Sequence, residues 1–363
     1  MEKSRRVNRE DDEQRRSSAE QKAESRKQKI IMTASAFKSF QEQSLNYFIR
    51  EHSHVPSGPI EAKSAWRGDA LRSATDEWLF VLSREELAEL SIAVDELIAR
   101  EVPLAEVSSA SLSLPLLQPR LHSWRETIKS GLGFVVLRGL PVEDWGVQKS
   151  SMAYWGIGHY LGCPGAQNPQ DELLGHVVDY GEETDNPIVR RYRTTGNIDF
   201  HCDAADAVGL MCLTTAKRGG QSRIVSSVSV FNEIYRQAPE LIPRLFEPIA
   251  LDLRDEEPEG MPGYFMLPPS CFNEESGLQT FYHSEYFRSA ERHADINYDE
   301  QTHALLDLYD SLCGRSDLQL DMWLEPGDMQ FISNHTIAHA RTDYEDWPEP
   351  ERKRHLLRLW LSL

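Results

Sequence analysis

The segment Phe200-His201-Cys202-Asp203 contains the pair of side chains best suited to chemistry. In a β-strand, residues two positions apart point to the same face, so His201 and Asp203 would direct an imidazole nitrogen and a carboxylate oxygen to one point. Two histidines and one carboxylate hold Fe(II) in non-haem oxygenases and leave coordination positions open. The pair therefore predicts two of the three protein ligands of such a metal site. For His-x-Asp taken alone, the alternative is an ordinary polar pair on a strand.

A third ligand must come from elsewhere in the chain, and the segment from Gly327 to Arg341 offers two histidines. A Gly-Asp pair there precedes a short apolar run that ends at Asn334, which predicts a turn followed by a strand. Only one of His335 and His339 needs to bind metal, and the other can pack or hydrogen-bond. We expect His339 to be the third ligand.

Two arginines near the end of the chain share a strand face with an apolar residue. In the run Arg354-His-Leu356-Leu-Arg358, the period of two places the three named residues on one side. A buried guanidinium is costly unless an anion meets it, and a carboxylate can meet it through two parallel hydrogen bonds. The arginines thus predict a carboxylate cosubstrate. The alternative is a strand edge at which both arginines reach solvent.

Together these segments resemble the taurine dioxygenase-like (TauD/TfdA) family of Fe(II)/2-oxoglutarate-dependent oxygenases, over roughly residues 115 to 363. Each part is common by itself, whereas the combination is specific. The run from Gly133 to Gly139 is also similar to the first core strand of that family. The other matching segments are His201-Cys-Asp203, Gly219-Gly-Gln-Ser222, Gly327-Asp328, Asn334-His-Thr-Ile-Ala-His339-Ala-Arg341, and Arg354 with Arg358.

The resemblance implies an enzyme that uses Fe(II), 2-oxoglutarate and O2. In the pattern of that family, His201, Asp203 and His339 correspond to the iron ligands. Arg354 looks like the arginine that pairs with the far carboxylate of 2-oxoglutarate, with Arg358 as the alternative or a helper. The implied reaction is oxidation of a substrate beside the metal, foremost hydroxylation, while 2-oxoglutarate is decarboxylated to succinate and CO2.

Three further residues receive roles from the same resemblance. Ser222 follows the Gly-Gly pair where the family often has a cosubstrate-binding threonine, and its hydroxyl can serve the same purpose. Asn197 and Arg341 match positions that we assign to substrate binding. The identity of the substrate does not follow from the sequence.

Two functions of other classes remain open at this point. A cupin-type hydrolase or isomerase would use the same ligands with zinc or manganese, and it would need neither succinate release nor the two arginines. A catalytically silent binding protein of the same fold would hold a small molecule without turnover. Decarboxylation of labelled 2-oxoglutarate separates these functions from the oxygenase.

The part of the chain before Cys163 is mostly helical in its pattern. Ser83 and Glu86 form a capping box ahead of apolar residues at helical spacing. A β-branched run closed by Gly and Pro predicts a strand at 133–141. The predicted helices span residues 84–100, 116–129 and 147–161.

After Cys163, short apolar runs alternate with turn residues, which is typical of a sandwich or barrel. Helices at 228–246 and 298–313 interrupt these strands. We therefore predict a mainly β fold with added helices, in which a double-stranded β-helix (jelly roll, cupin-like) core carries a helical N-terminal region. The predicted organisation is a flexible charged tail at 1–31, a helical extension at 32–114 and the oxygenase domain at 115–363.

Composition limits the partners of the protein. The chain has 363 residues, is 40% hydrophobic and carries a formal net charge of -19, so it can bury a core and repels nucleic acid. There is no apolar run near 18 residues and no secretory signal, so we expect no membrane partner. Five cysteines without a Cys-x-x-Cys pair indicate reduced thiols and a cytoplasmic location. The predicted partner is a small-molecule substrate, and a homo-oligomer is left open.

Overall fold

The protein is described here from a computed structural model that covers residues 37–168, 170–181, 193–257 and 259–363. Residues Lys38–Leu363 form one compact unit. The predicted tail at 1–31 lies outside the described residues.

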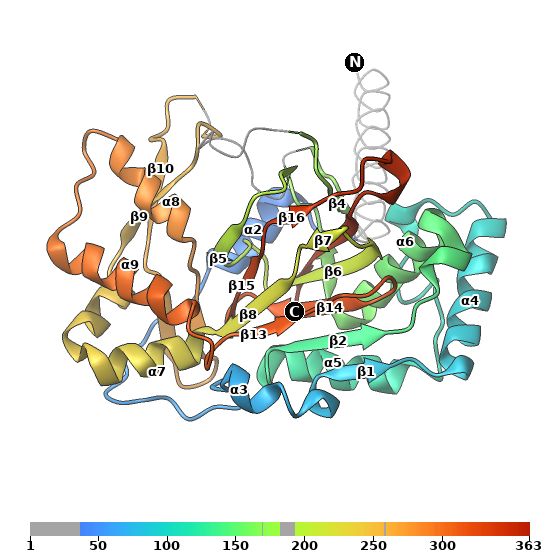
Figure 1. Cartoon of the computed structure of the whole chain (residues 1–363), viewed down its shortest axis with the longest axis horizontal. Helices are drawn as coiled ribbons and strands as arrows, with labels where there is room; N and C mark the ends of the chain where they lie inside the picture. Colours follow the sequence, from blue (N-terminus) through green and yellow to red (C-terminus); the bar gives the residue numbers. More distant parts are fainter. Residues whose placement is uncertain (1–36, 169, 182–192, 258) are drawn as a thin grey trace, which may run out of the picture. The chain divides into compact units, whose positions relative to one another are not determined.

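A seven-stranded sheet is the larger of two layers in this unit (Figure 1). Its strand order is β1-β2-β14-β6-β17-β3, and β4 also pairs with β17. The pairing of β1 with β2 is parallel, and the other pairings in this sheet are antiparallel. Through β1, a part of the predicted N-terminal extension joins the core sheet. The strands are Leu79–Val81 (β1), Phe134–Arg138 (β2), Cys163–Gly165 (β3), Gly175–Val177 (β4), Ala207–Thr214 (β6), Met329–Ser333 (β14) and His355–Ser362 (β17).

A four-stranded antiparallel sheet forms the second layer, in the order β13-β8-β15-β5. One buried cluster joins the two layers, because it contains Phe134 and Ile332 from the larger sheet and Ile224 and Ile337 from the smaller one. The two sheets therefore pack face to face, as expected for a jelly roll. The strands of the smaller sheet are Ile198–His201 (β5), Ser222–Ser226 (β8), Leu320–Met322 (β13) and Ile337–Arg341 (β15).

Two helices cover the larger sheet and a third packs on one of them, and the sequence predicts all three. Helix α5 contacts β2, α6 contacts β6 and β17, and α4 packs on α6. The capping box is present, because the Glu86 N–H donates to Ser83 Oγ over 3.2 Å and the Ser83 N–H donates to Glu86 Oε2 over 2.7 Å. Gly146, with φ of 67°, kinks α6 just before the predicted start of that helix. The helices are Arg84–Ala99 (α4), Gln118–Ser130 (α5) and Val142–Leu161 (α6).

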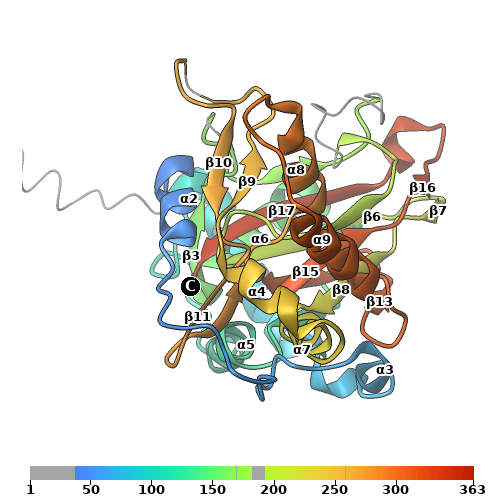
Figure 2. The same ribbon diagram turned by 90° about the vertical axis from the view of Figure 1, so that its left-hand side faces the viewer.

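A second group of helices packs around the smaller sheet, and Figure 2 shows α7, α8 and α9 from the side where they face the viewer. The predicted helix at 228–246 is split into α7 and the 3-10 helix η4, because Pro239 lacks the N–H that would continue the helix. Buried side chains that include Phe231, Tyr282 and Leu306 hold this group to the sheet. The elements are Ser227–Gln237 (α7), Pro239–Phe246 (η4), Ser284–Ser289 (α8) and Glu300–Cys313 (α9).

The remaining elements are short and connect or flank the two sheets. Helix α2 contacts β17, α3 contacts β13, and the hairpin of β9 and β10 contacts α8 through β9. They are Phe40–Phe48 (α2), Gly68–Leu71 (α3), Thr75–Glu77 (η1), Leu104–Glu106 (η2), Arg218–Gly219 (β7), Ile249–Asp252 (β9), Tyr264–Leu267 (β10), Ser270–Asn273 (β11), Gly277–Thr280 (β12), Ala290–Arg292 (η5), Tyr344–Glu345 (β16) and Pro350–Arg352 (η6).

Candidate metal centre and its two cavities

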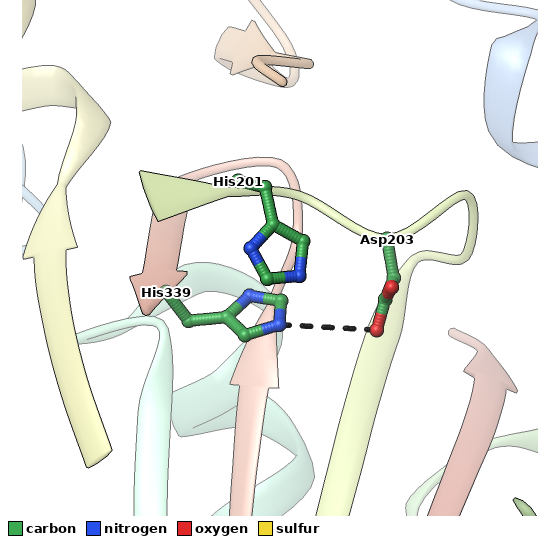
Figure 3. A group of neighbouring side chains, drawn as sticks. All are labelled: His201, Asp203 and His339. Atoms are coloured by element: carbon green, nitrogen blue, oxygen red, sulfur yellow. Dashed lines mark ion pairs between the residues drawn. The ribbon is translucent and has the colours of Figure 1, made fainter. Parts of the chain in front are cut away.

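Two histidines and one aspartate converge inside the unit. His201 is the last residue of β5, and it lies directly opposite His339 in the middle of the neighbouring strand β15. One donor atom from each of His201, Asp203 and His339 lies within 4.8 Å of the other two. Figure 3 shows the three side chains turned toward a common point, with His339 Nε2 at 3.9 Å from Asp203 Oδ2. This is the donor set of a 2-His-1-carboxylate metal site.

Asp203 reaches this point from a loop rather than from the strand on which we predicted it. Strand β5 ends at His201, so the alternation of a strand does not orient the carboxylate. Asn334 holds the loop instead: its Oδ1 accepts from the Asp203 N–H over 3.0 Å, and its Nδ2 donates to the Ala205 carbonyl over 2.9 Å. Cys202, between the two donors, is buried with its Sγ 3.5 Å from the Ile337 carbonyl.

His335, the other histidine of the segment, is occupied elsewhere. Its Nε2 lies 2.9 Å from Asp206 Oδ1, and its ring stacks on Tyr47 with the centroids 4.9 Å apart. The structure therefore brings His339, and not His335, next to His201 and Asp203.

The surroundings keep the donor atoms in the forms that bind metal. Burial, together with the neighbouring His201, lowers the pKa of His339 to about 3, so its imidazole is neutral at pH 7. Burial alone would raise the pKa of Asp203, but opposing contributions, foremost the positive charge of Arg358 and with it the hydrogen bond from Trp360, hold that pKa below its usual value. The site thus presents a neutral imidazole and a carboxylate, as a divalent cation requires.

The carboxylate of Asp203 has two further neighbours, both on β17. Trp360 Nε1 donates to Asp203 Oδ2 over 3.2 Å, and Arg358 Nη1 lies 3.8 Å from Asp203 Oδ1. The sequence motifs do not single out Trp360, although its position two residues after Arg358 places it on the same strand face. Nor do they single out Gln167, whose Oε1 accepts from Arg358 Nε over 2.7 Å.

An inner cavity lies between the two sheets, on one side of the metal cluster. Besides the three donor residues, its wall includes the predicted cosubstrate residues Ser222, Arg354 and Arg358, and also Arg341. Leu356 lines the same cavity, so Arg354, Leu356 and Arg358 share a face as the period of two predicts. Ser222 Oγ donates to Gln330 Oε1 over 3.0 Å.

Two arginines of the inner cavity are buried cations. Arg354 is only 6% exposed, and its Nη1 has no hydrogen-bond partner among the described residues. Burial lowers the pKa of Arg354, and burial with the nearby charge of Arg354 lowers the pKa of Arg341 to about 10. Arg341 Nη2 donates to the carbonyls of Thr194 and Gly196. Such burial of positive charge is costly without an anion, so the inner cavity is suited to one.

An outer cavity also adjoins the cluster and shares Ile198, His201, Asp203 and Arg358 with the inner one. Its wall combines aromatic side chains with charged ones, among them Arg254, whose guanidinium carbon lies 4.7 Å from the Tyr286 ring centroid. The other lining residues of note are Phe40, Phe48, Phe281, His283 and Trp360.

Of the two residues assigned to substrate binding, one lines neither cavity and the other lines the inner one. Asn197 is exposed, and its Nδ2 donates to Asp199 Oδ1 over 2.7 Å on the surface. It directly precedes β5 and lines neither cavity. Arg341, predicted to bind substrate, lines the inner cavity beside Arg354 rather than the outer one.

The family described as "Taurine catabolism dioxygenase TauD, TfdA family" matches residues 100–360. The chain belongs to the TauD/TfdA family. Enzymes of this family are non-haem iron oxygenases that use Fe(II), 2-oxoglutarate and O2, so this TauD/TfdA member is a 2-oxoglutarate-dependent dioxygenase. The donor set and the buried arginines described above fit both the metal and a dicarboxylate.

Two curated proteins are similar to this TauD/TfdA member over most of its length. FR-33289 synthase of Streptomyces rubellomurinus is 27% identical over 308 residues, which are 84% of this chain and 91% of that protein. Taurine hydroxylase-like protein SAT17 of Stachybotrys chartarum is 24% identical over 319 residues, which are 84% of this chain and 80% of that protein.

Solved structures support the fold of this TauD/TfdA member. Asparagine oxygenase in complex with Fe(II), 2S,3S-3-hydroxyasparagine and succinate superposes with a TM-score of 0.64 at 16% identity, covering 78% of this chain and 93% of that one. The non-haem iron oxygenase OrfP in complex with Fe and alpha-ketoglutaric acid gives a TM-score of 0.56 at 16% identity, with the same coverage. These likenesses confirm the predicted jelly-roll core with added helices. Within the described part of the chain, no helix is long and apolar enough to span a membrane.

Proposed function

We propose that this protein hydroxylates a small molecule, with Fe(II) held by His201, Asp203 and His339 and with 2-oxoglutarate held in the inner cavity by Arg354. One observation carries the proposal: the three donors converge at one wall of a cavity whose other wall contains a buried arginine with an unpartnered Nη1. The donors and Arg354 line the same cavity, so one dicarboxylate bound there would have the metal and the guanidinium as its partners. When bound, iron and 2-oxoglutarate supply the activation of dioxygen, and 2-oxoglutarate leaves as succinate and CO2.

The chain's own residues bind the cosubstrate and orient the metal-binding carboxylate. Arg354 presents a planar guanidinium that suits the far carboxylate of 2-oxoglutarate. Ser222, buried on β8 of the smaller sheet, lines the same cavity, and its hydroxyl would have to turn from Gln330 Oε1 to donate to that carboxylate. Arg341 lies beside Arg354, so we move it from substrate binding to the cosubstrate side. Arg358 faces Asp203 and serves the metal carboxylate more directly than the cosubstrate.

The outer cavity is the proposed substrate site. It adjoins the metal cluster as the inner cavity does, because His201 and Asp203 line both cavities. Its aromatic and charged lining suits a small molecule with both polar and apolar parts.

The five cysteines are free thiols, which supports the predicted cytoplasmic location.

The test is an oxygen-dependent assay of succinate release over a library of metabolites, with the protein loaded with Fe(II). We expect a substrate to raise succinate formation and to gain one oxygen atom from 18O2, seen as a mass shift of the product. Absence of any 2-oxoglutarate decarboxylation, with or without added metabolites, would contradict the proposal. Product formation without succinate would instead favour a cupin-type hydrolase or isomerase.

A further inference from the structure

We infer that Trp360 is a positioning residue for the metal-binding carboxylate, an inference that rests on the function proposed above. Trp360 lies on β17, and its Nε1 donates to Asp203 Oδ2 over 3.2 Å. The side chain is deeply buried, with 6% of its surface exposed. A buried indole N–H needs a partner, and here the partner is an oxygen of the proposed iron ligand.

The hydrogen bond fixes how the carboxylate is turned. Asp203 Oδ2 faces both Trp360 and His339, whose Nε2 is 3.9 Å away, whereas Oδ1 faces Arg358 Nη1 at 3.8 Å. The two oxygens are therefore distinguished by their neighbours. Because Asp203 lies in a loop, a carboxylate without these neighbours could rotate and present either oxygen, or both. Outer partners of this kind orient a ligand, and their loss typically weakens metal binding by about 10- to 100-fold.

The indole is itself held from two sides. The ring of Phe40, from α2, stacks on it with the centroids 6.4 Å apart and the planes 26° apart. The guanidinium carbon of Arg358 lies 5.2 Å from the indole centroid. Arg358 is anchored in turn by Gln167, whose Nε2 donates to the Arg358 carbonyl over 2.7 Å and whose Oε1 accepts from its Nε. The ring cannot swing away from Asp203 without disturbing these contacts.

Trp360 also lines the outer cavity, next to Phe40. A substrate bound there would touch the same indole that holds the carboxylate of Asp203. The structure thus links occupancy of the outer cavity with the orientation of a metal ligand through a single side chain. The residue combines positioning with substrate contact, and the two roles are separable by measuring metal binding without substrate.

The decisive variant is Trp360→Phe, which keeps an aromatic ring and removes the N–H donor. We expect its Fe(II) affinity, measured anaerobically by competition with a chelator, to fall about 10- to 100-fold. Trp323→Phe is the matched control, because Trp323 is 60% exposed and lines neither the inner nor the outer cavity. Its Fe(II) affinity should equal that of the unaltered protein.

A spectroscopic readout separates positioning from a merely structural role. Co(II) serves as the probe, because its ligand-field absorbance reports how the carboxylate binds and because it quenches a nearby indole. We expect Co(II) to quench part of the tryptophan emission of the unaltered protein and of Trp323→Phe. In Trp360→Phe the ligand-field spectrum should change, which reports the carboxylate, whereas the loss of that quenching only identifies Trp360 as the quenched indole.

Several outcomes would overturn the inference or the function beneath it. An Fe(II) affinity of Trp360→Phe within about threefold of the unaltered protein, with an unchanged Co(II) spectrum, removes Trp360 as a positioning residue. If Trp360→Phe fails to fold, the unaltered protein provides the test. Tryptophan emission that bound Co(II) does not quench would contradict the placement of the Trp360 indole beside the metal site. Failure of the unaltered protein to bind either metal refutes the proposed function instead.

Discussion

Arg354 brings a positive charge into the interior, and the surrounding side chains do not neutralise it fully. Its N–H on the main chain donates to Asp346 Oδ1 over 2.7 Å, and its guanidinium carbon lies 5.1 Å from the centroid of the Tyr344 ring. Neither contact supplies a carboxylate to Nη1, which is unpartnered within the described residues. An anion that enters the inner cavity would complete this environment.

Replacing Arg354 should weaken 2-oxoglutarate binding strongly. A carboxylate held by two charge-assisted hydrogen bonds, each worth roughly 1.5–3 kcal/mol, predicts a loss of about two to four powers of ten in Arg354→Gln. Arg354→Lys keeps the charge but not the planar fork, so its affinity should be intermediate. The measurement is an anaerobic titration that follows the absorbance of the iron–keto-acid complex.

The control for Arg354 is Arg218→Gln, because Arg218 is an exposed arginine paired with Glu345 on β7 and β16. That variant should bind 2-oxoglutarate as the unaltered protein does. If both Arg354 variants remain within about threefold of the unaltered protein, the assignment of 2-oxoglutarate to Arg354 fails.

The two histidines of β15 and its preceding turn should behave oppositely on substitution. His339→Ala removes a donor of the metal cluster, so we expect no stoichiometric iron. His335→Ala should retain most of the iron but lose stability by about 1–3 kcal/mol, since it deprives the buried Asp206 of a hydrogen-bond partner. Iron per chain and urea unfolding of both variants test this, and the reverse result would mean that the wrong histidine has been assigned.

At the scale of elements, local sequence signals anticipate the helices and most strands of the core. The capping box of Ser83 and Glu86 predicts α4 because its hydrogen bonds involve only neighbours in sequence. Asp203 shows where such reasoning stops. Its main-chain N–H is held by Asn334 and its carboxylate accepts from Trp360, both more than a hundred residues away, and no local pattern reveals these contacts.

The turn before β14 depends on a glycine that lies close to another segment. Gly327 has φ of 89°, and an added Cβ would overlap the main chain of Leu140. Gly277, with φ of 69°, has open space at the same position. Gly277→Ala should therefore cost only the left-handed strain of about 1–2 kcal/mol, whereas Gly327→Ala should lose about 1–3 kcal/mol more through overpacking. Urea unfolding measures both, and equal losses would contradict the close approach.

At the scale of the whole molecule, the contacts that form the site, among the residues the structure describes, lie within the unit Lys38–Leu363. Its aromatic wall begins at Phe40 on α2, which stacks on Trp360. The composition of residues 1–31, which are nearly all charged or small and polar, cannot support a core of its own. The sequence therefore assigns that segment no part in the site.

A chain that starts at Met32 should keep its function and stability. It retains the entire compact unit, so we expect its iron content and its thermal midpoint to match those of the full chain. Both are measured on the two proteins in parallel. A large fall in either value would show that the residues before Met32 contribute to the unit.

The position of His201 has a consequence for solubility. Strand β5 is an edge of the smaller sheet, and on its outer side the described residues supply only an isolated bridge from His201 to His283. His201 on β5 lies opposite His339 on β15, so a metal ion bound by both histidines would link the edge strand to the rest of the sheet. Without that metal link, β5 would detach more easily, and its unpaired backbone N–H and C=O groups could pair with a strand of another chain. The iron-free enzyme would then be both inactive and more prone to aggregation.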